Sequence, residues 1–350
     1  MAPLYESVPP KLYGGTERVV SYLTEELVRQ GHEVTLFASG DSVTGARLVP
    51  MCPESLRLDA TCKDQLAHHI LMLEQVFAEK ENFDIVHFHI DYLHFPLSRC
   101  HGIVNVTTLH GRLDMSDLLP LYRIFSDMPV ISISAAQREP LPFINWQGTV
   151  YHGLPEKQFR FHEKSEDYLV FLGRVSPEKG LDEAIEIAKR AGKKLKVAAK
   201  VDRADVDYFE KTIRSQLNDP RIEFLGEVGY PHKGELLGNA AALVFPINWP
   251  EPFGLVMIEA MACGTPVIAY PCGSVPEVLQ DGITGFVVTD AEAAAKAVAR
   301  IPEIDRAGCR RVFEERFSAQ RMTNDYLAIY QRLIGEEPEP LTLSDGVYVG

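Results

Sequence analysis

The sequence predicts an α/β protein built from two doubly wound domains. Short apolar, β-branched runs alternate with amphipathic stretches along the chain, and this alternation implies parallel sheets flanked by helices. The series runs twice, and a polar segment between about Gly153 and Asp167 separates the two runs. The chain has 350 residues, and single hydrophobic cores stop growing at about 250–300 residues. We therefore expect two domains, each with its own core.

The first half contains four candidate strands and one clear helix. The strands are expected at 34–38, 84–88, 104–108 and 130–134. Residues 17–30 carry apolar side chains at helical spacing, and Gly31 follows as a suitable C-cap. A doubly wound domain normally begins with a strand, whereas Met1 is followed here by Ala-Pro-Leu-Tyr and a proline-rich loop. The first strand is therefore expected to be missing or cut to a stub.

The second half shows the same alternation of strands and helices, with more elements. Its strands are expected at 168–172, 195–199, 222–225, 242–246, 266–269 and 285–288. Helices are expected at 181–191, 205–217, 233–239, 253–262, 291–300 and 318–334. The residues from 335 to 350 contain Glu-Glu-Pro-Glu-Pro and are expected to form a loose tail.

Composition limits the classes of function. The formal charge of -14 argues against nucleic acid as a partner, although a small basic pocket for one pyrophosphate stays compatible with it. Six cysteines without a C-x-x-C pair point to a reducing compartment. No apolar run reaches the ~18 residues of a membrane span, and no signal peptide is visible, so a cytoplasmic protein is expected. Peripheral contact with a membrane stays open.

The segment from Glu251 to Glu259 carries the strongest functional signal. Pro252 suits a helix entry, and the N–H groups of Phe253, Gly254 and Leu255 would then lie at the helix start, where phosphate binds well. Carboxylates such as Glu251 and Glu259 accept two hydrogen bonds at once, which suits the vicinal hydroxyls of a sugar or ribose. For isolated glutamates a solvated surface position is the commoner explanation. The small residues that follow, and the buried strand after them, weigh against it.

This segment resembles the E-x7-E signature of the family-4 retaining glycosyltransferases, together with the run E-A-x-A-x-G-x-P-V-I-A that follows it. The resemblance covers roughly Leu12 to Ile334 and implies the GT-B fold, two Rossmann-like domains facing a cleft. It implies that Glu259 binds the nucleotide ribose and Glu251 a hydroxyl of the donor sugar. The segment Pro252–Leu255 would bind the diphosphate and the sugar.

The resemblance also divides the chain by role. Residues 1–152 would form the acceptor-side domain and residues 153–317 the domain that binds the nucleotide-sugar. Residues 318–334 would form a C-terminal helix that packs back toward the first domain.

A second motif supplies positive charge. A candidate strand ends at Gly173, and Arg174 and Lys179 follow in a loop that leads into a helix. Cations at this place favour the departure of a diphosphate, because negative charge builds on it as the glycosidic bond breaks. Alone, both would be surface charges. The motif resembles the family's G-R-x-x-x-x-K-G pattern, which implies a catalytic role for Arg174 and Lys179.

The first half contributes weaker candidates. Tyr13-Gly14-Gly15 opens a helix and resembles the family's glycine loop, so Gly14 and Gly15 are expected to face the donor, and Glu17 is a weaker candidate. His110 follows a strand at an edge where α/β sheets place ligands, and it matches a family histidine near the donor sugar. His152 stands where many members have asparagine, and its contacts stay open.

Several other patterns carry weaker functional signals. Gly273 and Glu277 resemble a loop that closes the nucleotide pocket and are candidates only for supporting contacts. Asp205-Val-Asp207 has a D-x-D form used by metal-dependent glycosyltransferases, but its charged surroundings favour a solvated helix face. The histidines at 87, 89 and 94 lack the partners of a metal site, so no metal is expected. The chain also lacks G-x-G-x-x-G and G-x-x-x-x-G-K-[ST] motifs.

The resemblance implies transfer of a hexose from a nucleotide diphosphate sugar with retention of configuration. Because nothing in the sequence nominates a nucleophilic carboxylate, a metal-independent front-face mechanism is favoured, with no cofactor beyond the donor. The donor is expected to be UDP-glucose-like or GDP-mannose-like. The acceptor, a small molecule, a glycan or a lipid-linked sugar, stays open. The alternatives are a GT-B sugar-nucleotide epimerase, a phosphorylase, or a non-catalytic protein that binds nucleotide-sugars.

Overall fold

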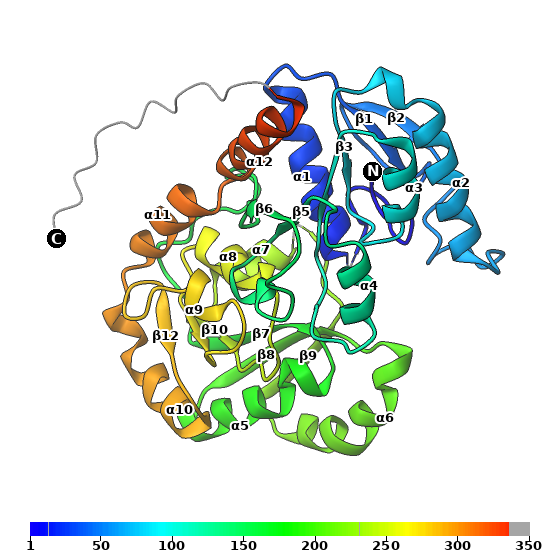
Figure 1. Cartoon of the computed structure of the whole chain (residues 1–350). Helices are drawn as coiled ribbons and strands as arrows, with labels where there is room; N and C mark the ends of the chain where they lie inside the picture. Colours follow the sequence, from blue (N-terminus) through cyan, green and yellow to red (C-terminus); the bar gives the residue numbers. More distant parts are fainter. Residues whose placement is uncertain (13, 231, 336–350) are drawn as a thin grey trace, which may run out of the picture.

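The protein consists of two lobes, each built on parallel sheet (Figure 1). The computed structural model describes residues 1–12, 14–230 and 232–335. The expected tail beyond Gly335 lies outside these residues, as does Tyr13 of the glycine loop. The architecture is α/β with two Rossmann-like sheets, as the sequence predicts.

The C-terminal lobe contains six parallel strands in the order β12-β11-β10-β7-β8-β9. When the strands from β7 to β12 are numbered 1 to 6 and the sheet is followed from β9 to β12, the order is 3-2-1-4-5-6, that of dinucleotide-binding sheets. The order reverses between β7 and β10, and such sheets bind ligands at the carboxyl ends of the strands beside that reversal. The strands are β7 (Tyr168–Arg174), β8 (Lys194–Lys200), β9 (Ile222–Gly226), β10 (Ala242–Phe245), β11 (Val267–Ala269) and β12 (Gly285–Val287).

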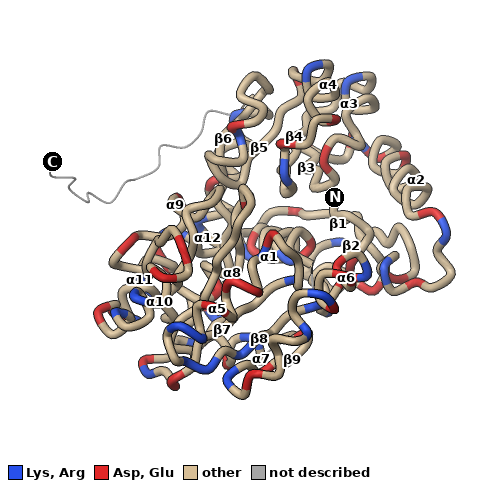
Figure 2. Tube along the Cα trace, turned by 90° about the horizontal axis from the view of Figure 1, so that it is seen from below, with Lys and Arg blue, Asp and Glu red and all other residues tan. Residues whose placement is uncertain are grey.

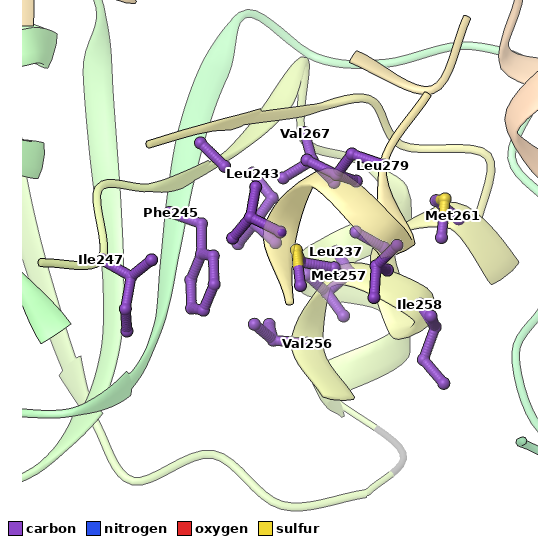
Figure 3. Packing of buried hydrophobic residues seen from close by; sticks show 14 of the residues in the cluster. Leu237, Leu243, Phe245, Ile247, Val256, Met257, Ile258, Met261, Val267 and Leu279 are labelled. Carbon is purple, nitrogen blue, oxygen red and sulfur yellow. The ribbon is translucent and has the colours of Figure 1, made fainter. Parts of the chain in front are cut away.

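Helices cover both faces of this sheet. Helices α5 (Leu181–Ala191) and α10 (Ala291–Arg300) pack together on one face, and α7 (His232–Gly238) and α8 (Leu255–Ala262) lie on the other (Figure 1). Seven of the eight residues of α8 are buried, and Figure 3 shows its side chains among those of β10 and β11. The start of α8 is therefore fixed in the core of the lobe.

The outer surface of the C-terminal lobe mixes charges of both signs. Around α10 and α11 (Arg306–Arg316), basic and acidic segments alternate along the chain (Figure 2). Two of these pairs are one helical turn apart, Glu292 with Lys296 and Arg310 with Glu314. Such exposed pairs contribute little to stability.

The N-terminal lobe divides its strands between two sheets. Strands β1 (Thr35–Ala38) and β2 (Arg47–Pro50) form one, and β3 (Val86–Phe88), β4 (Asn105–Thr108), β5 (Val130–Ser132) and β6 (Trp146–Thr149) form the other. Helices α1 (Gly15–Arg29), α2 (Gln65–Ala78), α3 (Phe95–His101) and α4 (Leu118–Ile124) belong to this lobe (Figure 1).

The first residues of the chain lie between these two sheets. The Ala2 N–H donates to the Phe37 carbonyl at 3.0 Å on one side, and the Met1 carbonyl accepts from the His89 N–H at 3.1 Å on the other. Residues 1 and 2 are thus hydrogen-bonded at the place where a doubly wound domain normally has its first strand. They do not themselves form a strand.

The chain passes between the lobes twice, and the two crossing segments are hydrogen-bonded to each other. The Leu154 N–H donates to the Phe317 carbonyl at 2.8 Å, and the Ala319 N–H donates to the Leu154 carbonyl at 2.9 Å. Helix α12 (Ala319–Ile334) follows the second crossing and lies beside α1 (Figure 1). Its Tyr330 hydroxyl lies 2.6 Å from His87 Nδ1 in the N-terminal lobe.

The ten predicted strands are confirmed, with ends that differ by up to two residues. The sequence patterns missed β2 and β6, and also α2, α3, α4, α9 (Val275–Val278) and α11. Strand β2 shows why: it is half-exposed and has no fully buried residue, so it lacks the apolar run of a core strand. The predicted helix at 205–217 is helical but irregular, with α-, π- and 3₁₀-type turns in succession.

Candidate active site

Two loops meet where the strand order of the C-terminal lobe reverses. Arg174 is the last residue of β7, and Lys179 ends a short 3₁₀ turn (Pro177–Lys179). Gly180 follows with φ +69°, and a Cβ there would lie 2.3 Å from the Pro246 carbonyl oxygen after β10. This contact explains the glycine next to Lys179, because the β7 and β10 loops approach too closely for a side chain.

The carboxylate of Glu251 lies at this junction. It forms an ion pair with Lys179, and Trp249 Nε1 donates to it at 3.0 Å. The Lys179 ammonium lies 5.1 Å from the centre of the Trp249 ring. Glu251 is 9% exposed. Its carboxylate is held in place by Lys179 from the loop after β7 and by Trp249 from its own loop.

Helix α8 begins two residues later than the sequence predicts. The predicted start was Phe253, whereas the first helical residue is Leu255 and Gly254 is the N-cap. Gly254 has φ +76°, a left-handed conformation that ends the preceding loop and that a pattern of apolar residues does not reveal. Phe253 precedes the helix, and its ring is buried. The N–H groups at the helix start therefore follow Gly254.

The second glutamate of the signature has a partner that the sequence did not reveal. Glu259 is 1% exposed, and its Oε1 lies 2.6 Å from the ammonium of Lys233 in α7. Burial lowers the pKa of Lys233, and the neighbouring Glu259 opposes that shift. Lys233 also lies 6.0 Å from the centre of the Tyr230 ring. The buried pair is thus flanked by an aromatic face.

Arg174 has a carboxylate partner as well. Its Nε lies 3.2 Å from Oδ2 of Asp205, which was expected on a solvated helix face. That expectation is correct for Asp207, whose carboxylate is 85% exposed, and wrong for Asp205, whose carboxylate is only 13% exposed. The periodicity of a single segment cannot show that β7 ends beside it.

The start of α1 faces the start of α8 across the cleft. Gly14 is the N-cap of α1, and Gly15 is its first residue. A Cβ on Gly15 would lie 3.7 Å from a methyl group of Leu255. Arg18, one turn on, lies 5.5 Å from the centre of the Tyr230 ring. Two helix N-termini from different lobes therefore converge on one space.

Three histidines form the opposite side of that space. His89 Nδ1 lies 2.9 Å from His110 Nε2, and the rings of His110 and His152 stack with centroids 5.3 Å apart. The His152 ring also meets the edge of Phe253 at 4.8 Å. Burial lowers the pKa of His110 to about 3 and the pKa values of His89 and His152 well below their usual value. All three imidazoles are therefore neutral near pH 7.

Most of these groups line one cavity of about 670 Å³ between the lobes; Asp205, the partner of Arg174, lies outside its lining. The sequence-predicted residues among its lining are Gly14, Gly15, Glu17, His110, His152, Gly173, Arg174, Lys179, Glu251, Pro252, Phe253, Gly254, Leu255 and Glu259. Lining residues that sequence reasoning missed include Arg18, His89, Asp91, Tyr230, Lys233 and Trp249. Glu17 is 6% exposed, and burial raises the pKa of its carboxyl. Gly273 and Glu277 lie outside the lining set.

Across residues 1–12, 14–230 and 232–335, no three histidine, cysteine or acidic side chains are grouped as a metal site would require. Within the same residues, every helix is too short or too polar to span a bilayer.

Two family profiles match the chain. Residues 155–315 match the glycosyl transferases group 1, and residues 13–139 match glycosyltransferase family 4. The chain belongs to the family 4 glycosyltransferases. It is therefore a glycosyltransferase enzyme.

Relatives of known sequence agree with this membership. The chain is 24% identical over 336 residues to an uncharacterized glycosyltransferase of Methanocaldococcus jannaschii, covering 80% of this chain and 82% of the relative. It is 33% identical over 186 residues to the D-inositol 3-phosphate glycosyltransferase of Mycobacterium tuberculosis. That match covers 49% of this chain and 38% of the relative, so it spans well under half of the relative's length.

Solved structures show the GT-B fold. Sucrose-phosphate synthase from Thermosynechococcus elongatus superposes with a TM-score of 0.76 at 20% identity, covering 92% of this chain and 94% of the other. HepE of Anabaena in complex with UDP and glucose superposes with a TM-score of 0.71 at 16% identity, covering 92% and 98%. The family 4 glycosyltransferase described here thus has the two-lobed architecture that its motifs imply.

Proposed function

We propose that this glycosyltransferase moves a hexose from a nucleotide diphosphate sugar to an acceptor hydroxyl with retention of configuration. One observation carries the proposal. The cations Arg174 and Lys179 and the carboxylates Glu251 and Glu259 line a single cavity, at the strand-order reversal where such sheets bind nucleotides.

The charges suggest a division of labour along the donor. Arg174 and Lys179 stabilise the diphosphate as it departs, because fixed cations favour the developing charge over the ground state. The N–H groups after Gly254 bind the same phosphates. Glu259, deepest in the lobe, binds the ribose hydroxyls, and Glu251 binds a hydroxyl of the sugar.

Retention fits a front-face reaction better than a covalent intermediate. Glu251 is held by Lys179 and Trp249, and Glu259 is held by Lys233, so each carboxylate is engaged as a hydrogen-bond acceptor. In the proposed reaction the departing diphosphate takes the proton of the acceptor hydroxyl. Arg174 and Lys179 supply positive charge at that place, so the step needs no metal ion.

The lobes would divide the substrates between them. Residues 153–317 would bind the donor, residues 1–152 would bind the acceptor, and residues 318–334 would join the C-terminal lobe to the first. The donor is proposed to be UDP-glucose-like or GDP-mannose-like. The HepE complex with UDP and glucose supports the first of these, since the fold is shared.

A thermal-shift screen tests the donor class. The expected result is stabilisation by a UDP- or GDP-hexose, which approaches about 2.7 kcal/mol when the ligand reaches 100 times its dissociation constant. ADP-sugars and free hexoses serve as matched comparisons. An NMR spectrum of the product then reports the anomeric configuration. A product with inverted configuration, or the absence of any shift with every nucleotide-sugar, would contradict the proposal.

A further inference from the structure

A glutamate outside the cavity joins the two lobes. Glu277 lies in the short helix α9 (Val275–Val278) of the C-terminal lobe. Its two carboxylate oxygens accept hydrogen bonds from the N–H groups of Ala135 and Ala136 in the N-terminal lobe, each at 2.7 Å. The Tyr151 hydroxyl donates to the same carboxylate at 3.0 Å. Hydrogen bonds to a carboxylate are stronger than neutral ones, so this contact ties the lobes firmly.

The next residue continues the connection toward the site. Gln137, 5% exposed, donates from Nε2 to the carbonyls of Leu109 at 2.9 Å and Gly111 at 2.8 Å. Its Oε1 accepts from the Ile133 N–H at 2.9 Å. Both amide hydrogens are therefore used to hold the carbonyl groups of the residues before and after His110.

The other end of the connection reaches the donor segment. The Ser274 N–H donates to the Glu251 carbonyl at 2.9 Å, and the Ser274 hydroxyl donates to the Phe253 carbonyl at 2.8 Å. Gly273 has φ +57°, and a Cβ there would lie 2.4 Å from the backbone of Glu251. The Glu277 N–H donates to the Ser274 carbonyl at 2.9 Å, which fixes α9 to this segment.

We propose that Glu277 and Gln137 form an interlobe strap that positions His110 against the donor segment Glu251–Gly254. The two sides of the cavity belong to different lobes, so their separation depends on contacts between the lobes. The strap runs from Ser274 to Glu277, whose carboxylate accepts hydrogen bonds from the Ala135 and Ala136 N–H groups. It continues along the backbone to Gln137, which donates hydrogen bonds to the loop of His110. Neither Glu277 nor Gln137 touches the cavity, so both are positioning residues.

The strap rests on the proposed function, because it assigns His110 to the donor site. A purely structural role for Glu277 would alter stability alone. A positioning role predicts slower turnover with unchanged nucleotide binding, since the binding groups all lie in the C-terminal lobe.

Hydrogen exchange tests the strap without measuring turnover. In Glu277→Ala, exchange of the Ala135 and Ala136 amides is expected to rise by roughly tenfold or more, and exchange in the segment 109–111 is expected to rise with it. Glu277→Gln, which keeps one acceptor oxygen, should give a smaller rise. The control is Glu303→Ala, because Glu303 pairs only with Arg300 of its own lobe in the described structure. Unchanged exchange at 135–136 or at 109–111 in Glu277→Ala would overturn the proposal.

Kinetics then separate positioning from binding. With UDP-glucose as probe and release of UDP as the readout, kcat in Glu277→Gln and in Gln137→Met is expected to fall on the order of 10- to 100-fold. The dissociation constant for UDP is expected to stay within about twofold of the wild-type value. Since both residues act in series, the double variant should lose no more than the worse single variant.

The outcomes distinguish the two proposals. If wild-type protein consumes UDP-glucose while both variants match it, or if the losses multiply in the double variant, the strap is wrong and the proposed function stands. If wild-type protein binds and consumes no nucleotide-sugar, the proposed function fails. The exchange experiment would still decide whether Glu277 holds the loop of His110.

Discussion

The two sides of the cavity use opposite chemistry. The C-terminal lobe presents a charged wall of Arg174, Lys179, Lys233, Glu251 and Glu259, in which every member has an oppositely charged partner. The facing imidazole wall consists of His89, His110 and His152, which burial keeps neutral.

The difference in charge gives the two sides of the cleft different roles in the reaction. A charged wall with paired ions binds a charged donor, because its cations and carboxylates are already oriented. A neutral wall can donate and accept hydrogen bonds beside the sugar without competing for the diphosphate. The charged wall should therefore govern nucleotide affinity and departure of the diphosphate, whereas the imidazole wall should affect turnover without changing nucleotide affinity.

The largest effect is expected from the cation at the end of β7. Arg174→Ala should lower kcat by about 10²–10³-fold, because it removes a fixed charge from the departing diphosphate. Turnover of the donor selected by the thermal-shift screen is the measurement. Lys211→Ala is the matched control, since Lys211 pairs with Asp207 on the surface. Equal kcat values in the two variants would show that Arg174 does not stabilise the departing diphosphate.

Glu259→Gln should weaken nucleotide binding by roughly 10- to 100-fold, the range of a charge-assisted hydrogen bond. It should also lower the free energy of unfolding by about 3–5 kcal/mol, because it leaves Lys233 buried without its counter-charge. Adding Lys233→Met should restore stability but not binding, as measured by denaturant unfolding and calorimetry. Recovery of binding in the double variant would show that Glu259 acts only as the partner of Lys233.

A smaller effect is expected at Trp249, whose ring contacts Lys179 and Glu251 of the charged wall. Trp249→Phe removes the hydrogen bond to Glu251 and keeps an aromatic face beside Lys179. The expected loss in kcat/KM is only about 3- to 10-fold, because Lys179 still holds the Glu251 carboxylate after this hydrogen bond is lost. Trp146→Phe is a control in the other lobe, where the indole N–H donates to the Leu141 carbonyl at 2.9 Å. A loss no greater than that of the control would leave Glu251 positioned by Lys179 alone.

The last effect is a pH dependence of stability, to which the imidazole wall contributes together with the other buried histidines, His69, His87 and His94. All these histidines have lowered pKa values in the folded chain, so below about pH 6.5 the unfolded chain binds protons that the folded chain does not. Stability should therefore fall as pH drops from 7 toward 5, by at most about 1.4 kcal/mol per pH unit for each histidine.

Thermal unfolding of His152→Asn and His32→Asn between pH 7 and 5 checks this. The first variant should reduce the slope of the pH dependence by the share of one histidine, and the second should not, because His32 is exposed beyond the end of α1. A flat profile in the wild-type protein would mean that the imidazole wall takes up protons in the folded state.

The charged wall shows how much of the site the sequence could predict. Arg174, Lys179, Glu251 and Glu259 stand in two short motifs, and the fold brings both motifs to the cavity. Lys233 and Tyr230 were missed because they lie in a loop and helix without a motif, and only tertiary packing places them beside Glu259.

The imidazole wall was harder to foresee. His110 follows a predicted strand, and sheet topology places such residues at the ligand edge. His89 was considered only as a metal ligand, whereas its partner is a second histidine 21 residues away. The interlobe contact of Glu277 depends on how the lobes face each other, which the local pattern of neither lobe contains.

The division between the two walls is tested most directly by calorimetric titration of UDP into Glu259→Gln and His110→Ala, side by side with wild-type protein. We expect Glu259→Gln to raise the dissociation constant for UDP by about tenfold or more. We expect the dissociation constant of His110→Ala to stay within about twofold of wild type while its turnover falls. Equal weakening of UDP binding in the two variants, or undiminished binding in Glu259→Gln, would contradict this division of roles.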